Sequence, residues 1–282
     1  MTNRLLSYLR DIRDRQRIAI ALSKGAATMH ARRIDLTQPS SWEFSGFSQN
    51  GEDGVLDVLR SQLLRSDRYF VEIGAADGIE NNTAWLLVAE KYSGVTFEGD
   101  PALVERARRV VAGYSIGAEC HHMFVTLERA NELKSMLLYQ QPDVFSLDID
   151  GNDYHIARAI LESGVRPKIA VVEYNSVYGP ERKATIEYQP DFDFREAHPT
   201  QLYYGVSVCA WRALFEAHGY RFVTVERNGV NAFFVDPAHF ERSFLDAIRG
   251  LGFAPNRYQA MKFRRTDAEQ FALIADRKIV HV

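Results

Sequence analysis

The chain has 282 residues, 46% hydrophobic and 25% charged, which is enough to bury one large α/β core with an appended element. A formal net charge of −3 argues against a nucleic-acid-binding surface. Because the two cysteines are Cys120 and Cys209, far apart in the chain, we expect neither a disulfide framework nor a cysteine-ligated zinc site. With no long apolar run and no signal-peptide pattern, the chain is expected to be cytoplasmic.

The first predicted element is a basic helix within residues 1–33. This stretch contains eight arginines and lysines but only two acids, Asp11 and Asp14. Its apolar residues recur at partly helical spacing. Such a helix packs on its own domain or on a partner copy in a homo-oligomer, or else it contacts an anionic membrane surface or another partner. We assign residues 1–46 to an N-terminal helical extension.

Strands that alternate with helices follow. A helix is expected at 50–65, and β-branched or aromatic runs predict five strands within 69–74, 94–98, 114–126, 143–149 and 168–175. An irregular segment, 176–204, precedes a helix at 207–219 and a hairpin at 220–235 with an Asn-Gly turn. This order predicts an α/β fold with a mostly parallel sheet that ends in an antiparallel pair, over residues 47–237. Residues 238–282 are expected to be a helical tail.

Six motifs occur in order between residues 48 and 235. They are "SQNGEDG", "FVEIGAADGIENNT", "FEGDP", "LDIDGNDY", "VVEYN" and "GVNAFFV". Together they resemble the FkbM-type methyltransferases, which are class I S-adenosylmethionine-dependent enzymes. The resemblance implies a Rossmann-like seven-stranded sheet, S-adenosylmethionine as the cofactor, and methyl transfer to a hydroxyl of a saccharide, glycan or related metabolite in polysaccharide biosynthesis. Methylation at nitrogen, or a non-catalytic module that keeps the fold, are the alternatives.

The first glycine turn carries the argument for the cofactor. Gly74 and Gly78 bracket a turn where the backbone approaches a ligand. The acids Glu72 and Asp77, and the spacing of the two glycines, depart from the dinucleotide fingerprint. Acids at this place would repel a pyrophosphate and attract the ammonium of a methionine group, which favours S-adenosylmethionine over a nicotinamide cofactor.

Further residues are expected around the cofactor. Glu98, at the end of the second strand, can accept hydrogen bonds from both ribose hydroxyls. Asn82 and Thr83 either orient the methionine end or cap the following helix. The resemblance adds Gln49 near the same region, and it places Thr126 near the adenine ring.

The acidic stretch "SLDIDGNDY" follows the fourth strand and is the predicted transfer site. Asp148 is expected to face both cofactor and acceptor. With Glu173 and Asn175 after the fifth strand it resembles the metal sites of catechol and macrolide-sugar O-methyltransferases, and its oxygen ligands suit Mg²⁺. In a metal-free alternative, Asp150 acts as base or helix cap, and His155 is the preferred general base unless the helix turns it to solvent.

The acceptor is expected to lie over residues 176–204, because long loops in compact domains are usually functional or disordered. Aromatic residues there could stack on sugars, and Arg182, Lys183 and Arg195 could hold an acidic group. A dimer interface is the alternative for this segment. The expected partners are therefore a small-molecule or glycan acceptor, with no nucleic acid.

Overall fold

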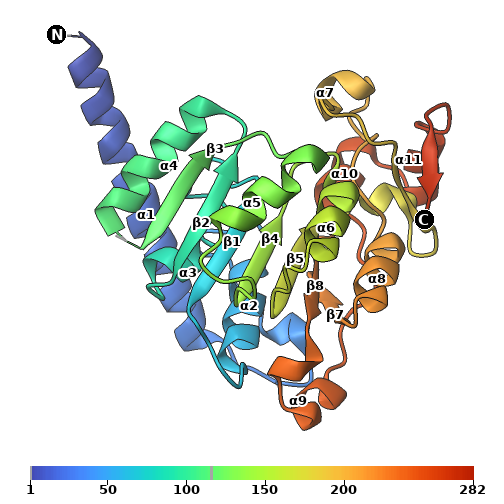
Figure 1. The fold of residues 1–282 in the computed structure, drawn as a ribbon, viewed down its shortest axis with the longest axis horizontal. Coiled ribbons are helices and arrows are strands. Elements are labelled where there is room, and N and C mark those ends of the chain that lie inside the picture. Colours follow the sequence, from blue (N-terminus) through green and yellow to red (C-terminus); the bar gives the residue numbers. More distant parts are fainter. Residues whose placement is uncertain (1, 115–116) are drawn as a thin grey trace.

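The computed structural model describes residues 2–114 and 117–282, and a seven-stranded sheet lies at its centre (Figure 1). The strand order is β3-β2-β1-β4-β5-β8-β7. The first five strands are parallel, and β8 runs antiparallel to both β5 and β7. This topology confirms the predicted class I methyltransferase fold. The strands are β1 (Tyr69–Ile73), β2 (Ser93–Glu98), β3 (Ala118–His122), β4 (Val144–Leu147), β5 (Ile169–Glu173), β7 (Arg221–Val225) and β8 (Asn231–Val235).

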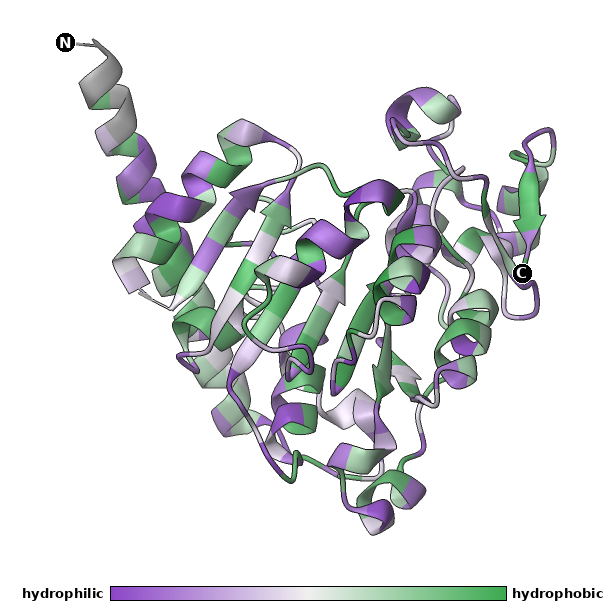
Figure 2. Ribbon diagram, in the orientation of Figure 1, coloured by the Kyte–Doolittle hydropathy of each residue, from purple (hydrophilic) through white to green (hydrophobic). Residues whose placement is uncertain are grey.

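Helices cover both faces of the sheet. Successive strand residues point to opposite faces, so Phe70 packs in one apolar layer and Val71 in the other. The central strands β4 and β5 are mostly hydrophobic, whereas the edge strand β3 and the helices also carry hydrophilic residues (Figure 2). The first layer contains α1 (Thr2–Ala31), α2 (Glu52–Ser61), α3 (Ala84–Val88), α4 (Pro101–Tyr114) and α9 (Arg242–Ala247), and the second contains α5 (Ala130–Met136), α6 (Asp153–Glu162) and α8 (Val208–Ala217).

Helix α1 packs on the domain through its second half. Ile18 and Ala21 are buried in the first layer, and Gly25 lies so close to Trp85 that a side chain there would meet the indole ring. Among the described helices, α1 included, none has an apolar stretch long enough to cross a membrane.

The segment 176–204 and the C-terminal tail fold together into a small unit beside the sheet. Strand β6 (Ala184–Ile186) pairs antiparallel with β9 (Ile279–His281). Buried aliphatic and tyrosine side chains join the segment to the tail, with Ile274 fully buried among them. The segment is therefore more ordered than a loop, and the tail is not wholly helical. This unit also contains α7 (Phe194–Ala197), α10 (Arg257–Phe263) and α11 (Asp267–Ala272).

The expected third strand was placed only broadly by the sequence. The structure gives β3 as Ala118–His122, an exposed edge strand with a single buried residue, Cys120. The expected range also includes Ser115 and Ile116, which lie outside the described residues. An edge strand buries little, so its sequence carries a weak apolar pattern.

Candidate functional site

A cavity of about 900 Å³ opens at the carboxyl ends of β1, β2 and β4. Ligands of open α/β sheets bind at this edge. Arg195 is the only basic residue among the described residues that line the cavity, whereas the acids are numerous. They are Glu52, Glu72, Glu80, Glu98, Asp100, Asp148, Asp150, Asp191 and Asp193. The cavity therefore favours a cationic or neutral ligand over an anionic one.

Gly74 forms the floor of the cavity between two strands. Its φ of +84° is in the left-handed region, and a Cβ there would lie 1.6 Å from the carbonyl oxygen of Asp148. Only glycine fits at this place, because any side chain would collide with the backbone that follows β4. The turn after β1 thus brings the cavity floor against the acidic stretch after β4.

Glu98 ends β2 with its carboxylate held in place. Oε2 accepts a hydrogen bond from the backbone N–H of Ala76, and Oε1 accepts one from Asp100, each at 2.9 Å. A carboxylate has about four acceptor positions, so both oxygens can still accept from a ligand. The side chain is partly exposed and lines the cavity, as a ribose-binding acid should.

Glu72 holds the loop that enters α3. Its buried carboxylate accepts hydrogen bonds from the side chains of Asn81 and Thr83 and from the backbone of Asn82. Burial raises the pKa of Glu72 to about 7. The Asn82 amide also donates to Ser146, at 3.1 Å. Glu72 and Asn82 line the cavity, whereas Thr83 supports the loop from behind.

Besides Thr83, three of the expected cofactor residues do not line the cavity. The Asp77 carboxylate forms ion pairs with Arg17 at 2.6 Å and Arg106 at 3.0 Å, so it anchors helices rather than facing a ligand. Gly78 allows close packing on Ala107 of α4. Thr126 does not line the cavity either, although its neighbour Val125 does.

Gln49 does line the cavity, as expected, and its amide donates to Glu80 at 3.2 Å. Two further asparagines were not singled out from the sequence. The side-chain oxygens of Asn81 and Asn231 are buried and have no hydrogen-bond partner in the described part of the chain, although both residues line the cavity. Asn231 starts β8 directly opposite Glu173 of β5, so its place follows from strand pairing. Two unpaired acceptors at one cavity fit a ligand that donates hydrogen bonds.

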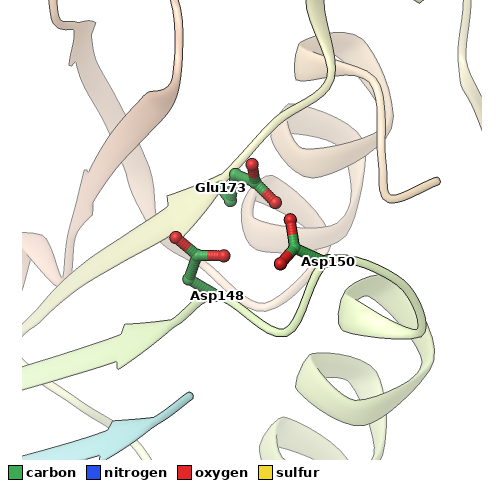
Figure 3. Close-up of side chains that lie close together, drawn as sticks. All are labelled: Asp148, Asp150 and Glu173. Atoms are coloured by element: carbon green, nitrogen blue, oxygen red, sulfur yellow. The ribbon is translucent and has the colours of Figure 1, made fainter. Parts of the chain in front are cut away.

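The acidic stretch after β4 forms a cluster with the end of β5. Oxygen atoms of Asp148, Asp150 and Glu173 all lie within 4.8 Å of one another (Figure 3). Asp148 and Asp150 line the cavity, and Glu173 lies against them from β5. Asp153 is buried behind them and accepts from the backbone N–H groups of Ile149 and Gly151, so it stabilises the turn.

Burial and like charge raise the pKa values in this cluster. Burial, followed by repulsion from Asp150 and Asp153, raises the pKa of Asp148 well above its ordinary value. The pKa of Glu173 is raised in the same way, by burial and then by Asp148. Loss of hydration in the crowded pocket raises the pKa of Asp150 to about 6, with Asp153 adding to the effect. Among the described residues, no basic side chain forms an ion pair with any of the three cluster carboxylates. The cluster therefore favours protons or a cation.

Asn175 is not part of the cluster, contrary to the expected metal site. Its amide nitrogen donates to the carbonyl oxygens of Leu202 and Tyr204, and its oxygen accepts from the backbone of Val177. Strand β5 ends at Glu173, and Asn175 already caps the short 3-10 helix Ser176–Tyr178. The third oxygen group of the cluster is instead the Asp150 carboxylate, on a residue with a φ of +52°.

His155 also differs from its expected role as a base. Its Nε2 lies 2.9 Å from the carbonyl oxygen of Ile186, and its ring contacts the ring of Tyr188. Burial lowers the pKa of His155. The residue does not line the cavity, and its contact with Ile186 holds β6 against α6.

The segment over the site presents aromatic rings rather than bases. Phe192 and Phe194 line the cavity, and Phe192 packs directly on Gly151. Arg182 instead stacks over Phe271, 4.1 Å from the ring centre, and donates to a backbone carbonyl. Neither Arg182 nor Lys183 lines the cavity. Of the three bases expected to hold an acidic group, Arg195 alone lines it.

Comparison with known proteins gives similarity of fold only. No family model and no curated protein sequence matches the chain. An O-methyltransferase from Bacillus cereus, solved in complex with SAH, is 15% identical over 78% of this chain and 89% of its own, with a TM-score of 0.44. A SAH-bound methyltransferase from Podospora anserina is 14% identical over 66% and 76%, with a TM-score of 0.41. Similarity at this level says nothing about residue roles, so the fold class rests on the strand order itself.

Proposed function

We propose that the chain is an S-adenosylmethionine-dependent methyltransferase that acts on a hydroxyl of a saccharide, glycan or related metabolite. One observation carries the proposal. A single cavity is lined by Glu98 at the end of β2 and by the carboxylates that follow β4. A cofactor bound to the first would place its reactive group toward the second.

The cavity suits this cofactor for three reasons. The Glu98 carboxylate can accept from the ribose hydroxyls, and the unpaired oxygens of Asn81 and Asn231 can accept from the methionine ammonium. The excess of acids favours a ligand with a sulfonium and an ammonium. Apolar side chains provide a place for the adenine ring, and they are Phe97, Leu103, Met123, Phe124 and Val125.

The carboxylate cluster supplies the base for the transfer. As the methyl carbon bonds to the acceptor oxygen, its bond to sulfur breaks and the hydroxyl loses its proton. Asp150, with a pKa of about 6, is mostly ionised at neutral pH and lines the cavity, so it can take this proton. Burial and like charge raise the pKa values of Asp148 and Glu173 beside it, which favours their protonated forms.

The same cluster fits a divalent cation. Three oxygen groups close together, without a basic partner among the described residues, are the ligands that Mg²⁺ prefers. Asp148, Asp150 and Glu173 would hold the ion, with Asn175 excluded by its backbone contacts. A bound Mg²⁺ would lower the pKa of an acceptor hydroxyl.

The walls of the cavity support a saccharide as the acceptor. Phe192 and Phe194 offer ring faces on which a sugar can stack, and the surrounding acids can accept from its hydroxyls. Among the described residues that line the cavity, Arg195 is the only base beside nine acids, which disfavours an acidic sugar. A neutral saccharide fits best. The acid excess equally favours an amine, so methylation at nitrogen is the second candidate.

Calorimetry with S-adenosylmethionine, followed by methyl transfer from labelled cofactor, tests the proposal. Neutral glycan and amine fractions are offered separately, with Mg²⁺ or with a chelator. We expect micromolar to submillimolar binding and label in the neutral glycan fraction. Label in the amine fraction alone would establish the second candidate, and failure to bind at submillimolar concentration would reject both. Asp150→Asn should bind the cofactor but lose transfer, because it removes the proposed base, whereas a binding module would show no transfer in either protein.

A further inference from the structure

Helix α1 has two apolar faces, and only one of them is covered. The covered face carries Ile18 and Ala21, which are buried against the domain, and Asp14, which is paired with Arg106. Large apolar residues also lie on the side of the helix that faces away from the domain. A second apolar face needs an explanation of its own, because a surface helix of a globular domain usually carries polar residues there.

The second face is a stripe along the outside of α1. Leu5, Tyr8, Leu9 and Ile20 form this outer stripe, and their exposed fractions are 59%, 62%, 52% and 61%. At about 100° per residue these four side chains fall within an arc of about 120°, opposite Ile18 and Ala21. Small residues continue the stripe toward the C-terminal end of the helix, namely Ala19, Ala26 and Ala27, and all three are exposed.

Basic residues flank the outer stripe on both sides. Arg13 and Lys24 lie along one side of it and Arg15 along the other, and all three are exposed. The first 33 residues contain only two acids. One of these, Asp14, is already paired with Arg106, and the other, Asp11, is partly buried. The outer stripe therefore lies in a strongly positive surface.

This charge pattern distinguishes between two occupants. A second copy of the chain, packed stripe to stripe, would bring the two sets of basic residues together. Their repulsion would destabilise such a dimer. An anionic lipid surface would accept the apolar side chains and attract every flanking base, at about 1 kcal/mol for each. Charge complementarity therefore favours the lipid surface.

The N-terminal half of α1 is free to reach such a surface. Arg17 pairs with Asp77 and Glu80, just after the carboxyl end of β1, so that residue marks the level of the cavity edge. The preceding 15 or so residues rise about 20 Å beyond it at 1.5 Å per residue. Figure 1 shows this end of α1 projecting from the body, on the side to which the parallel strands point.

We propose that the outer stripe of α1 docks the protein on an anionic lipid bilayer. The stripe inserts its apolar side chains at the level of the headgroups, and the flanking bases contact anionic lipid. This binding is independent of the proposed methyl transfer, because none of its residues lines the cavity.

Flotation with vesicles of phosphatidylcholine alone, and of phosphatidylcholine mixed with phosphatidylglycerol, tests the docking. The full chain should bind the mixed vesicles, less well as salt rises, and not the neutral ones. Binding should fall by at least about tenfold in an apolar variant and in a charge variant. The apolar variant carries Tyr8→Ser, Leu9→Ser and Ile20→Ser. The charge variant carries Arg13→Gln, Arg15→Gln and Lys24→Gln.

A matched control changes exposed apolar residues elsewhere. Tyr258→Ser with Met261→Ser removes side chains that are 71% and 78% exposed on α10, and it should bind as the unchanged chain does. Circular dichroism verifies that each variant is folded. Equal binding to both kinds of vesicle, no binding to either, or a charge variant that binds normally would overturn the proposal. So would a dimer in solution that the apolar variant alone dissociates, because the stripe would then serve a second copy.

Discussion

Replacing Glu173 with glutamine should stabilise the protein at alkaline pH. The Glu173 carboxylate is buried within 4.8 Å of the oxygens of Asp148 and Asp150. Two ionised carboxylates about 5 Å apart repel each other by about 3 kcal/mol at an effective dielectric constant of about 20. The folded chain lessens this repulsion by keeping protons, which is why the pKa values of Asp148 and Glu173 are raised.

The sign of the pH dependence follows from those raised pKa values. Between the ordinary and the raised pKa of Glu173, the folded state binds a proton that the unfolded state has released. Stability is therefore lost as pH rises through this window. Glu173→Gln removes the group that titrates, so the variant should gain up to about 3 kcal/mol over the unchanged chain at pH 8, and little at pH 5.

Thermal unfolding at the two pH values, in the presence of a chelator, measures the effect. At about 2 °C per kcal/mol for a chain of this size, we expect Tm to rise by about 6 °C at pH 8. Glu181→Gln is the matched control, since Glu181 is exposed and does not line the cavity. If the cluster holds Mg²⁺, adding the ion should raise the Tm of the unchanged chain and not of the variant. A lower Tm for Glu173→Gln at pH 8, or the same gain at pH 5, would refute the like-charge argument.

Three further substitutions test the site. Glu98→Ala should weaken S-adenosylmethionine binding by roughly 1 to 3 kcal/mol in calorimetry, because ribose hydroxyls would lose their acceptor. Gly74→Ala should destabilise the fold by about 3 kcal/mol or more in urea unfolding, because its Cβ would overlap the Asp148 carbonyl. His155→Ala should change the rate of methyl transfer by no more than about threefold, while the lost hydrogen bond to Ile186 costs about 1 kcal/mol of stability.

Matched controls separate these effects from general damage. Glu105→Ala removes an exposed acid of α4 outside the cavity and should leave cofactor affinity unchanged. Gly113→Ala places its Cβ in open space, so it should not destabilise the chain. A loss of methyl transfer by more than about a hundredfold in His155→Ala would restore the histidine as a base. Normal cofactor affinity in Glu98→Ala would remove the ribose assignment.

The sequence predicted the sheet well because its buried strands have strong local patterns. The apolar runs that contain β1, β4 and β5 are short and rich in β-branched and aromatic residues, and each is fully buried in the structure. The Asn-Gly turn likewise indicated the antiparallel pair of β7 and β8. The second small sheet was missed because β6 and β9 are three-residue strands almost 100 residues apart.

The sequence by itself determined the class of fold and the edge of the sheet at which the candidate site lies. Gly74 and Asp148 directly follow strands and Glu98 ends one, each strand is recognisable from its own local sequence, and all three residues line one cavity. The tertiary structure alone decided which neighbouring polar side chains face that cavity. Asp77 is turned to Arg17 and Arg106, Asn175 to backbone carbonyls, and His155 to β6, because each finds its partner in a segment distant in sequence. Side-chain direction at a strand end depends on such partners, and the residues beside it in the chain do not specify them.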